Sequence, residues 1–212
     1  MQVAFLLFDE LTALDAVGPY DVFNRIPGAE TVFVAEEPGQ FQTEAGGLVL
    51  AASNSLDDVT SPDVLVVPGG NGTRPLLTND TVLDWVRSVH ETTTWTTSVC
   101  TGSLVLAAAG LLDGAPATTH WMAREELAAL GAVPTAERVV EYGKIVTAAG
   151  VSAGIDMALT LTQRMNGDEI AQAIQLGIEY DPQPPFDSGS PEKADPKLVA
   201  MLRQFRARPQ TV

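Results

Sequence analysis

Short runs of apolar residues alternate along the chain with longer stretches in which apolar positions recur at helical spacing. The first run, VAFLLF at positions 3–8, is apolar without a break and is typical of a strand buried on both faces. Because strands and helices take turns, we expect an α/β fold with a mostly parallel central sheet. The pattern predicts strands at 2–8, 31–36, 63–67, 93–99 and 116–119, hairpins at 40–50 and 133–147, and helices at 13–25, 80–91, 101–112, 121–130, 152–166, 168–180 and 195–207.

Two stretches depart from this regular alternation. Pro19 lies inside the predicted helix 13–25, and a proline is tolerated in a helix only within the first turn. Residues 181–195 are rich in Pro, Gly and Ser, which predicts an irregular segment before the last helix. We find neither an internal repeat nor an interior linker. Residues 1–212 are therefore expected to form one domain, with an irregular tail and a short helix over residues 182–212.

Composition and charge narrow the class of protein. Hydrophobic residues make up 45% of the 212 positions, enough for a core, and no apolar run approaches the roughly 18 residues that a membrane helix needs. The formal charge of −15, from 27 acidic and 12 basic residues, argues against binding to nucleic acid or to anionic membranes. The chain opens directly on a strand without a signal peptide, and a single cysteine suits a reducing compartment, so we expect a cytoplasmic protein.

The single cysteine, Cys100, stands where a predicted strand gives way to a predicted helix. The segment TWTTSV before it is rich in β-branched residues, and the run LVLAAAGLL shortly after it is rich in Ala and Leu. A residue at such a junction projects from a sharp turn, like a nucleophile elbow, and the amides that begin the helix favour its thiolate. We therefore expect a lowered pKa and a nucleophilic role for Cys100; the alternative is a buried cysteine that serves as a small apolar residue.

Two further segments are expected near Cys100, because sites in open α/β sheets form beyond the carboxyl ends of the strands. Asp15 follows the first strand. Either it caps a helix, or its carboxyl lies near Cys100, where burial raises its pKa and makes it a proton carrier at neutral pH. Gly69 and Gly70 follow the strand at 63–67. Either they only end that strand, or their N–H groups face a substrate atom.

Histidines and cofactor motifs add little chemistry. His120 ends a strand, from which it either pairs with Cys100 or serves as a core or helix-capping residue. One cysteine and two scattered histidines predict no metal site. The glycine-rich turns match neither the GxGxxG pattern nor the P-loop pattern, so we expect no phosphate-containing cofactor.

Five segments together resemble the ThiJ/PfpI superfamily. The resemblance covers nearly the whole chain, and the combination of Asp15 with Cys100-Thr101 is its most specific part. The segments are LDAVGPYDV from residue 14, PGG at 68–70, SVCTGS at 98–103, TTHW at 118–121 and GVSAGID at 150–156. Within the superfamily, the chain is most similar to the branch that hydrates isocyanides.

The resemblance implies a flavodoxin-like three-layer α/β/α sandwich, similar to the class I glutamine amidotransferases, that forms a homodimer without metal or cofactor. It also implies hydration of an organic isocyanide to an N-formamide. In that reaction Cys100 is the nucleophile, Asp15 carries protons, and Thr101 contributes its N–H group and hydroxyl. The fold also resembles the amino-terminal domain of AraC-type regulators, which need a further DNA-binding region.

The residues that the resemblance implies for binding the substrate are Gly69, Gly70 and His120. The N–H group of Gly70 is a candidate to orient water or to stabilise developing charge. Other branches of the superfamily fit less well, since the proteolytic branch has a histidine where this chain has Thr101. Two other functions stay open: a redox or stress sensor that oxidises Cys100, and another cysteine hydrolase or lyase that acts on a small molecule.

Overall fold

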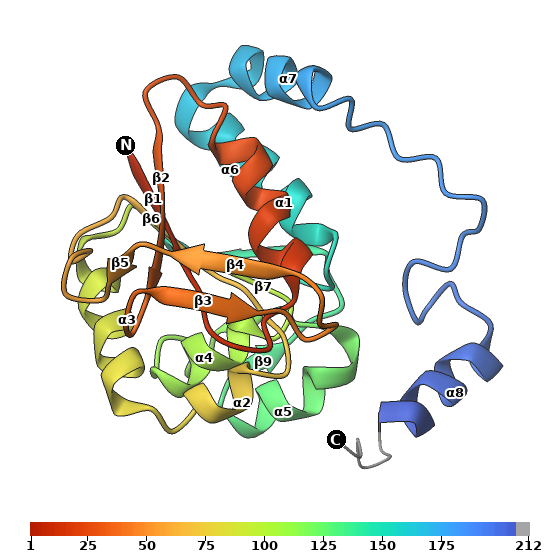
Figure 1. Cartoon of the computed structure of the whole chain (residues 1–212). Coiled ribbons are helices and arrows are strands. Elements are labelled where there is room, and N and C mark those ends of the chain that lie inside the picture. Colours follow the sequence, from red (N-terminus) through yellow and green to blue (C-terminus); the bar gives the residue numbers. More distant parts are fainter. Residues whose placement is uncertain (207–212) are drawn as a thin grey trace. The chain divides into compact units, whose positions relative to one another are not determined.

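The computed structural model describes residues 1–206, which fall into two compact units, residues 1–179 and a tail that begins at Tyr180 (Figure 1). Strands and helices alternate through the first unit as the sequence pattern predicts. The strands are β1 (Gln2–Leu6), β2 (Glu30–Ala35), β3 (Gly39–Gln42), β4 (Val49–Ala52), β5 (Asn54–Ser55), β6 (Val64–Val67), β7 (Trp95–Val99), β8 (Pro116–Ala117), β9 (Val133–Pro134), β10 (Val139–Tyr142) and β11 (Ile145–Ala148). The helices are α1 (Ala13–Phe23), α2 (Thr73–Leu76), α3 (Asp80–Thr92), α4 (Gly102–Ala108), the 3-10 turn η1 (Trp121–Ala123), α5 (Arg124–Ala129), α6 (Ala153–Asn166), α7 (Asp168–Gly177) and α8 (Pro196–Arg206).

Seven strands form the central sheet, in the order β10-β11-β7-β6-β1-β2-β5. β10 runs antiparallel to β11, and the other neighbouring strands are parallel. Without β10 and the two-residue edge strand β5, the parallel strands β2-β1-β6-β7-β11 follow the flavodoxin-like order 2-1-3-4-5. The prediction of a mostly parallel, flavodoxin-like sheet is therefore confirmed.

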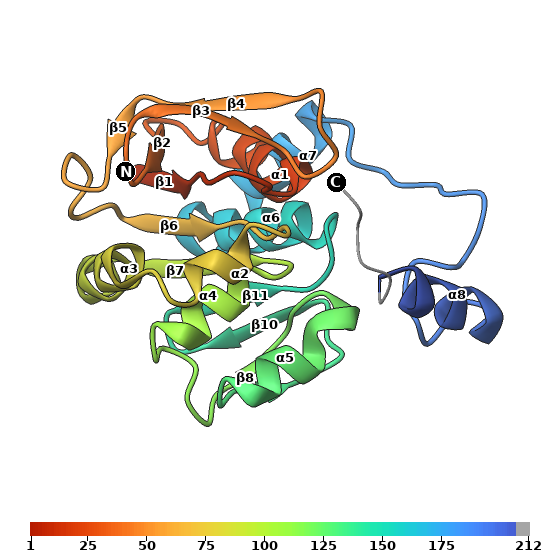
Figure 2. The same ribbon diagram turned by 60° about the horizontal axis from the view of Figure 1, so that its bottom comes forward.

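Helices cover both faces of this sheet, because successive residues of a strand point to opposite sides. On one face, Val3 and Phe5 of β1 belong to the same core as Phe23 of α1 and Met157 of α6. α1 and α6 lie side by side on this face (Figure 1). On the other face, Leu6 of β1 belongs to a core that includes residues of α3 and α4, and α2 packs against α4 there (Figure 2). The first unit is a three-layer α/β/α sandwich.

Helix α1 differs from the prediction at Pro19, which lies in the middle of the helix rather than in its first turn. Proline supplies no N–H for the carbonyl four residues earlier, which is that of Asp15. Packing compensates, since α6 approaches α1 and β7 very closely at Gly154. A Cβ atom on Gly154 would lie 3.0 Å from Pro19 Cγ and 3.0 Å from Val99 Cγ2. The glycine therefore permits the contact that holds α1 against the strand leading to Cys100.

The remaining differences lie at the ends of elements. α4 ends at Ala108 rather than at 112, because Gly110 has a φ of +80°, the left-handed conformation that closes a helix. The predicted helix 121–130 is divided into η1 and α5. In the predicted hairpin 133–147, β10 pairs with β11, whereas β9 pairs with β8. The short elements β5 and α2 were not predicted from the sequence.

The second unit begins at Tyr180. Residues 181–195 hold neither helix nor strand, and α8 follows them, as predicted. The predicted end of that helix at residue 207 lies outside the described residues. Four large apolar side chains of α8 are exposed, by 45% to 67%: Leu198, Met201, Leu202 and Phe205. None of the helices in residues 1–206 is both long enough and apolar enough to cross a membrane.

Candidate active site

The carboxyl ends of three neighbouring strands, β1, β6 and β7, bring the predicted site residues together. Asp15 lies in the first turn of α1, beyond β1; Gly69 and Gly70 follow β6; Cys100 follows β7. The first two of these segments are joined by a hydrogen bond of 2.8 Å from the Thr12 N–H to the Gly69 carbonyl. The sheet order thus places residues from distant parts of the sequence in one small volume.

Cys100 occupies a strained turn. Its φ of +57° is a left-handed conformation that is unfavourable for a residue with a side chain. The Cys100 N–H donates to the Ala148 carbonyl at 3.0 Å, and its carbonyl accepts from the Thr119 hydroxyl at 3.0 Å. The turn is also tight at Gly102, where a Cβ atom would lie 2.0 Å from the Val67 carbonyl oxygen. These contacts hold the sharp turn that the sequence predicted at Cys100.

Asp15 is fully buried, and its carboxyl serves the site rather than its own helix. Oδ2 accepts a hydrogen bond of 3.0 Å from the Gly69 N–H. The Cys100 thiol interacts with the same carboxyl, whose buried Oδ1 has no hydrogen-bond partner of standard geometry among residues 1–206. The N-cap of α1 is Thr12, so the helix-capping alternative for Asp15 is wrong.

Burial dominates the acidity of both groups. It raises the pKa of Asp15 from 3.8 to about 8, although the hydrogen bonds with Gly69 and Cys100 act in the opposite direction. Burial, followed by the negative charge of Asp15, also raises the pKa of Cys100. The expected rise for Asp15 is confirmed, and the expected lowering for Cys100 is wrong, because the loss of water outweighs the N–H groups beside the sulfur. Because each group acts on the pKa of the other, we expect the two to titrate as a coupled pair.

Thr101 connects the sulfur of Cys100 to the loop after β6. Its N–H and its hydroxyl both lower the pKa of the Cys100 thiol. The hydroxyl itself donates to the Gly70 carbonyl at 3.2 Å. The hydroxyl oxygen also accepts a hydrogen bond of 2.9 Å from the Gly70 N–H and lies 3.3 Å from Thr73 Oγ1. Thr101 therefore fixes the distance between the elbow and the neighbouring loop.

The N–H groups of Gly69 and Gly70 do not face a substrate position, which was one of the two alternatives predicted from the sequence. They donate to Asp15 and Thr101, respectively, and not to an open substrate position. No side chain fits at the first glycine, because a Cβ atom on Gly69 would lie 2.5 Å from Thr101 N and 2.9 Å from Asp15 Oδ2. These two glycines position the functional side chains on either side of them.

His120 caps the turn η1. Its Nδ1 accepts a hydrogen bond of 3.4 Å from the Met122 N–H, and its ring lies 5.8 Å from that of Trp121, measured between centroids. Its connection to the elbow runs through the preceding residue, Thr119, which holds the Cys100 carbonyl. Of the interpretations weighed for His120, these contacts match the capping role.

Two charged residues beside the site escaped the sequence analysis. Arg74 donates to the Gly70 carbonyl at 3.1 Å and forms an ion pair of 3.0 Å with Glu126. Glu44, from the β3–β4 loop, accepts a hydrogen bond of 2.6 Å from the Thr12 hydroxyl. Neither residue belongs to a motif. The only sequence signal for Glu44 was its position as an acidic residue shortly before the glycine pair of the predicted hairpin at 40–50.

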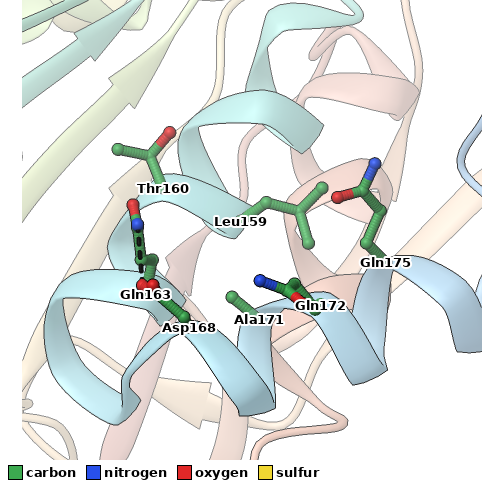
Figure 3. A pocket seen from close by; sticks show the side chains of 7 residues that line it. All are labelled: Leu159, Thr160, Gln163, Asp168, Ala171, Gln172 and Gln175. Carbon is green, nitrogen blue, oxygen red and sulfur yellow. Dashed lines mark hydrogen bonds between the residues drawn. The ribbon is translucent and has the colours of Figure 1, made fainter.

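A separate groove with a cavity volume of about 280 Å³ lies between α6 and α7 (Figure 3). Its lining holds neither cysteine nor histidine, and the Gln163 amide donates to the Asp168 carboxyl at 2.9 Å within it. Across residues 1–206, no cluster of three or more His, Cys, Asp or Glu side chains is placed to hold a metal ion. The groove is lined by Leu159, Thr160, Gln163, Asp168, Ala171, Gln172 and Gln175.

Comparisons with known proteins show which proteins this chain resembles over its length. An isonitrile hydratase from Pseudomonas putida is 46% identical over 209 residues, which cover 99% of this chain and 91% of that protein. The crystal structure of a ThiJ/PfpI family protein from Pseudomonas syringae is 36% identical, with a TM-score of 0.93 over 97% of this chain and 86% of that one. The HTH-type transcriptional regulator GbdR of Pseudomonas aeruginosa is 29% identical over 84% of this chain, but the match spans 50% of the regulator.

The family model matches a long, continuous part of the chain. The description of that family is DJ-1/PfpI, and the matched segment, residues 1–164, contains all three strand ends that form the site. The flavodoxin-like sheet and the elbow at Cys100 fit the same assignment. This chain therefore belongs to the DJ-1/PfpI family.

Proposed function

We propose that the chain is an isocyanide hydratase, which adds water to an organic isocyanide and releases an N-substituted formamide. Its near full-length similarity to the isonitrile hydratase of Pseudomonas putida supports this function. One observation carries the chemistry: the Asp15 carboxyl and the Cys100 thiol are both buried at adjoining strand ends, and each acts on the pKa of the other. A nucleophile and a proton carrier held together away from water suit a neutral substrate whose terminal carbon accepts both a soft nucleophile and a proton.

The first step joins the substrate to Cys100. The reacting form of the pair has its proton on Asp15 and its negative charge on the Cys100 thiolate. The sulfur attacks the isocyanide carbon and forms the C–S bond, while Asp15 gives its proton to the same carbon. The product is a covalent thioimidate, R–N=CH–S, and Asp15 is left as a carboxylate. Because its pKa is raised to about 8, this carboxyl is able to donate a proton at neutral pH.

The second step consumes water. The Asp15 carboxylate takes a proton from a water molecule as the water oxygen bonds to the thioimidate carbon, and it passes this proton to the substrate nitrogen. The resulting tetrahedral intermediate, R–NH–CH(OH)–S, collapses when its C–S bond breaks. The hydroxyl proton goes to Asp15, the electron pair of the C–S bond returns to the Cys100 sulfur, and the formamide R–NH–CHO leaves. The pair has then regained its starting form.

The neighbouring residues support both steps. Thr101 stabilises the thiolate as it forms and as it leaves, since its N–H and its hydroxyl both lower the pKa of Cys100. The glycines at 69–70 act by holding the Asp15 carboxyl and the Thr101 hydroxyl in place. We assign His120 to the substrate side of the elbow, because it directly follows the threonine that holds the Cys100 carbonyl.

Direct turnover tests this function. An aliphatic and an aromatic isocyanide are incubated with the purified chain, and formamide is followed by NMR. We expect turnover by the wild type and none by Cys100→Ser, with circular dichroism as the control for folding. Mass spectrometry with a slowly reacting isocyanide should show one adduct, on Cys100. Oxidation of Cys100 without formamide would favour the sensor, and peptide cleavage lost in Cys100→Ser would favour a hydrolase.

We also propose a homodimer and a cytoplasmic location. The exposed apolar residues of α8 support the dimer, because a helix with such a face is stable when a partner covers it. α8 contains no acidic residue, whereas the whole chain has a charge of −15, so a second copy offers opposite charge. Light scattering should give about twice the chain mass of 22.4 kDa; a monomer at micromolar concentration would contradict the dimer. The single free cysteine supports the location.

A further inference from the structure

Three loops meet beside the site, and Glu44 joins all of them. Its N–H donates to the Leu11 carbonyl at 3.0 Å. Its carboxyl accepts a hydrogen bond of 2.6 Å from the Thr12 hydroxyl through Oε1 and one of 3.2 Å from the Asn71 N–H through Oε2. Glu44 thus fastens the β3–β4 loop both to the segment that leads into Asp15 and to the loop after β6.

The hairpin holds Glu44 in a defined position. The preceding residue, Thr43, is buried and forms a bridge with Leu11. Gly46 and Gly47, with φ values of +69° and +73°, turn the chain back toward β4 in a conformation that glycine adopts readily. The Glu44 side chain itself is exposed, so a fixed acidic group stands at the solvent side of the buried pair.

The charge of Glu44 acts on both members of that pair. It raises the pKa of Asp15 and the pKa of Cys100, as a nearby negative charge does for any acid. Within the part of the chain that the structure describes, the other influences on the pair are its burial, its mutual interaction and the hydrogen bonds of Gly69 and Thr101. Glu44 is therefore the charge from outside the pair that bears on its proton.

We propose that Glu44 is a positioning residue of the active site, which joins the three loops around Asp15 and Cys100 and fixes a negative charge beside them. In the resting enzyme burial is the main reason that the pair keeps its protons, and the Glu44 charge adds to that effect and lowers the fraction of thiolate further. Only the turnover measurement of this proposal depends on the proposed function. Its chemical measurement, the alkylation of Cys100, does not depend on the identity of the substrate.

Alkylation by iodoacetamide tests the proposal, because only the thiolate reacts and Cys100 is the single cysteine of the chain. The rate is measured against pH by mass spectrometry. Glu44→Gln removes the charge but keeps the length of the side chain: its single oxygen can accept from the Asn71 N–H, and its NH2 group can donate to the Thr12 hydroxyl in place of accepting from it. Glu44→Asp keeps the charge but shortens the reach of the side chain by one methylene. Glu37→Gln, which removes an exposed charge from the segment between β2 and β3, is the matched control.

In Glu44→Gln we expect the midpoint of alkylation to move to lower pH by about half a unit, and turnover at pH 7 to rise roughly threefold. In Glu44→Asp we expect the midpoint to stay and kcat to fall severalfold, because the shorter side chain cannot accept both hydrogen bonds. Glu37→Gln should match the wild type in both measurements.

Salt provides a test that needs no variant. Since Glu44 is exposed, raising the ionic strength should screen its charge and move the wild-type midpoint toward that of Glu44→Gln. A Glu44→Gln midpoint equal to that of the wild type would overturn the proposal, as would a wild-type midpoint that does not respond to salt. If the wild type turns over no isocyanide, the proposed function fails, and the alkylation midpoint still decides the role of Glu44.

Discussion

The groove between α6 and α7 and the strand ends around Cys100 differ in what they offer to a small molecule. The groove has a volume of about 280 Å³, and five of its seven lining side chains end in amide, hydroxyl or carboxyl groups (Figure 3). The strand ends hold a fully buried carboxyl and a thiol that is 5% exposed. A hollow is the usual first candidate for a binding site, but here the candidate catalytic groups lie elsewhere.

One carboxyl from each region shows why the difference matters. Asp168 of the groove is exposed and accepts a hydrogen bond from Gln163 at 2.9 Å. Asp15 has the same functional group but no exposed surface, and its pKa is raised to about 8. A carboxyl becomes a proton carrier at neutral pH by losing its water. The site is therefore formed where loops exclude solvent, and the substitutions below measure how strongly activity depends on that arrangement.

The largest effect is expected from Asp15→Asn. The amide keeps the size of the side chain but does not carry a proton between thiol, substrate and water, so kcat should fall by about 10²-fold or more. Steady-state turnover of an isocyanide measures the loss. A kcat close to that of the wild type would remove Asp15 from the mechanism.

The stability of the same variant provides its control. The folded state holds the Asp15 proton more tightly than the unfolded chain does, since the pKa is about 8 against 3.8. The contribution of this group to stability is therefore complete below pH 3.8 and is lost as the pH rises toward 8. Asn does not ionise, so thermal unfolding should show Asp15→Asn gaining stability relative to the wild type between pH 5 and pH 8. A stability difference between the variant and the wild type that stays the same from pH 5 to pH 8 would contradict the raised pKa.

Gly69→Ala is expected to have the next largest effect. The new methyl group would lie 2.5 Å from Thr101 N and 2.9 Å from Asp15 Oδ2, so the carboxyl or the elbow must move. A displacement of this kind should lower kcat/KM by roughly ten- to a hundredfold. Gly177→Ala, at the end of α7, is the matched control, because no atom lies within 4 Å of its added Cβ. Equal activity of both variants would show that the tight packing at Gly69 does not matter for catalysis.

The fold and the two candidate catalytic residues could be predicted because local pattern marks them. Each strand of the parallel sheet is a short apolar run; Cys100 directly follows one such run, and Asp15 lies in the segment after another. In a parallel sheet the ends of those strands meet, so a prediction of the fold class already brought the two residues near each other.

The features that could not be predicted depend on contacts between distant segments. Pro19 is accommodated in the middle of α1 because α6 packs against it through Gly154, which the sequence around Pro19 does not reveal. The raised pKa of Cys100 could not be predicted without knowing that the residue is buried. The local signal, the start of a helix after Cys100, favoured a lowered pKa instead. Glu44 reaches the site from a hairpin, and the pairing of loops that places it there follows no motif.

The dependence of kcat/KM on pH should be moderate and should follow the titration of Asp15 and Cys100. At low pH both groups carry a proton, and the reacting form appears as one proton leaves. Because the pKa of Asp15 is about 8, kcat/KM should rise with pH up to that region and then level off. The rise should be at most about tenfold per pH unit. A profile that is flat between pH 5 and pH 9 would show that the pair does not control the rate.

The smallest effect is expected from the groove. Gln172→Ala removes an exposed amide from its lining, and this residue belongs to α7, outside the three loops that surround Cys100. We expect kcat and KM within about twofold of the wild type, as for surface substitutions away from a site. Gln163→Ala, which removes the hydrogen bond to Asp168, should behave in the same way. A severalfold rise in KM in either variant would mean that isocyanides bind in the groove before they react. The contrast between the two regions would then mark two stages of one pathway rather than a site and an unrelated hollow.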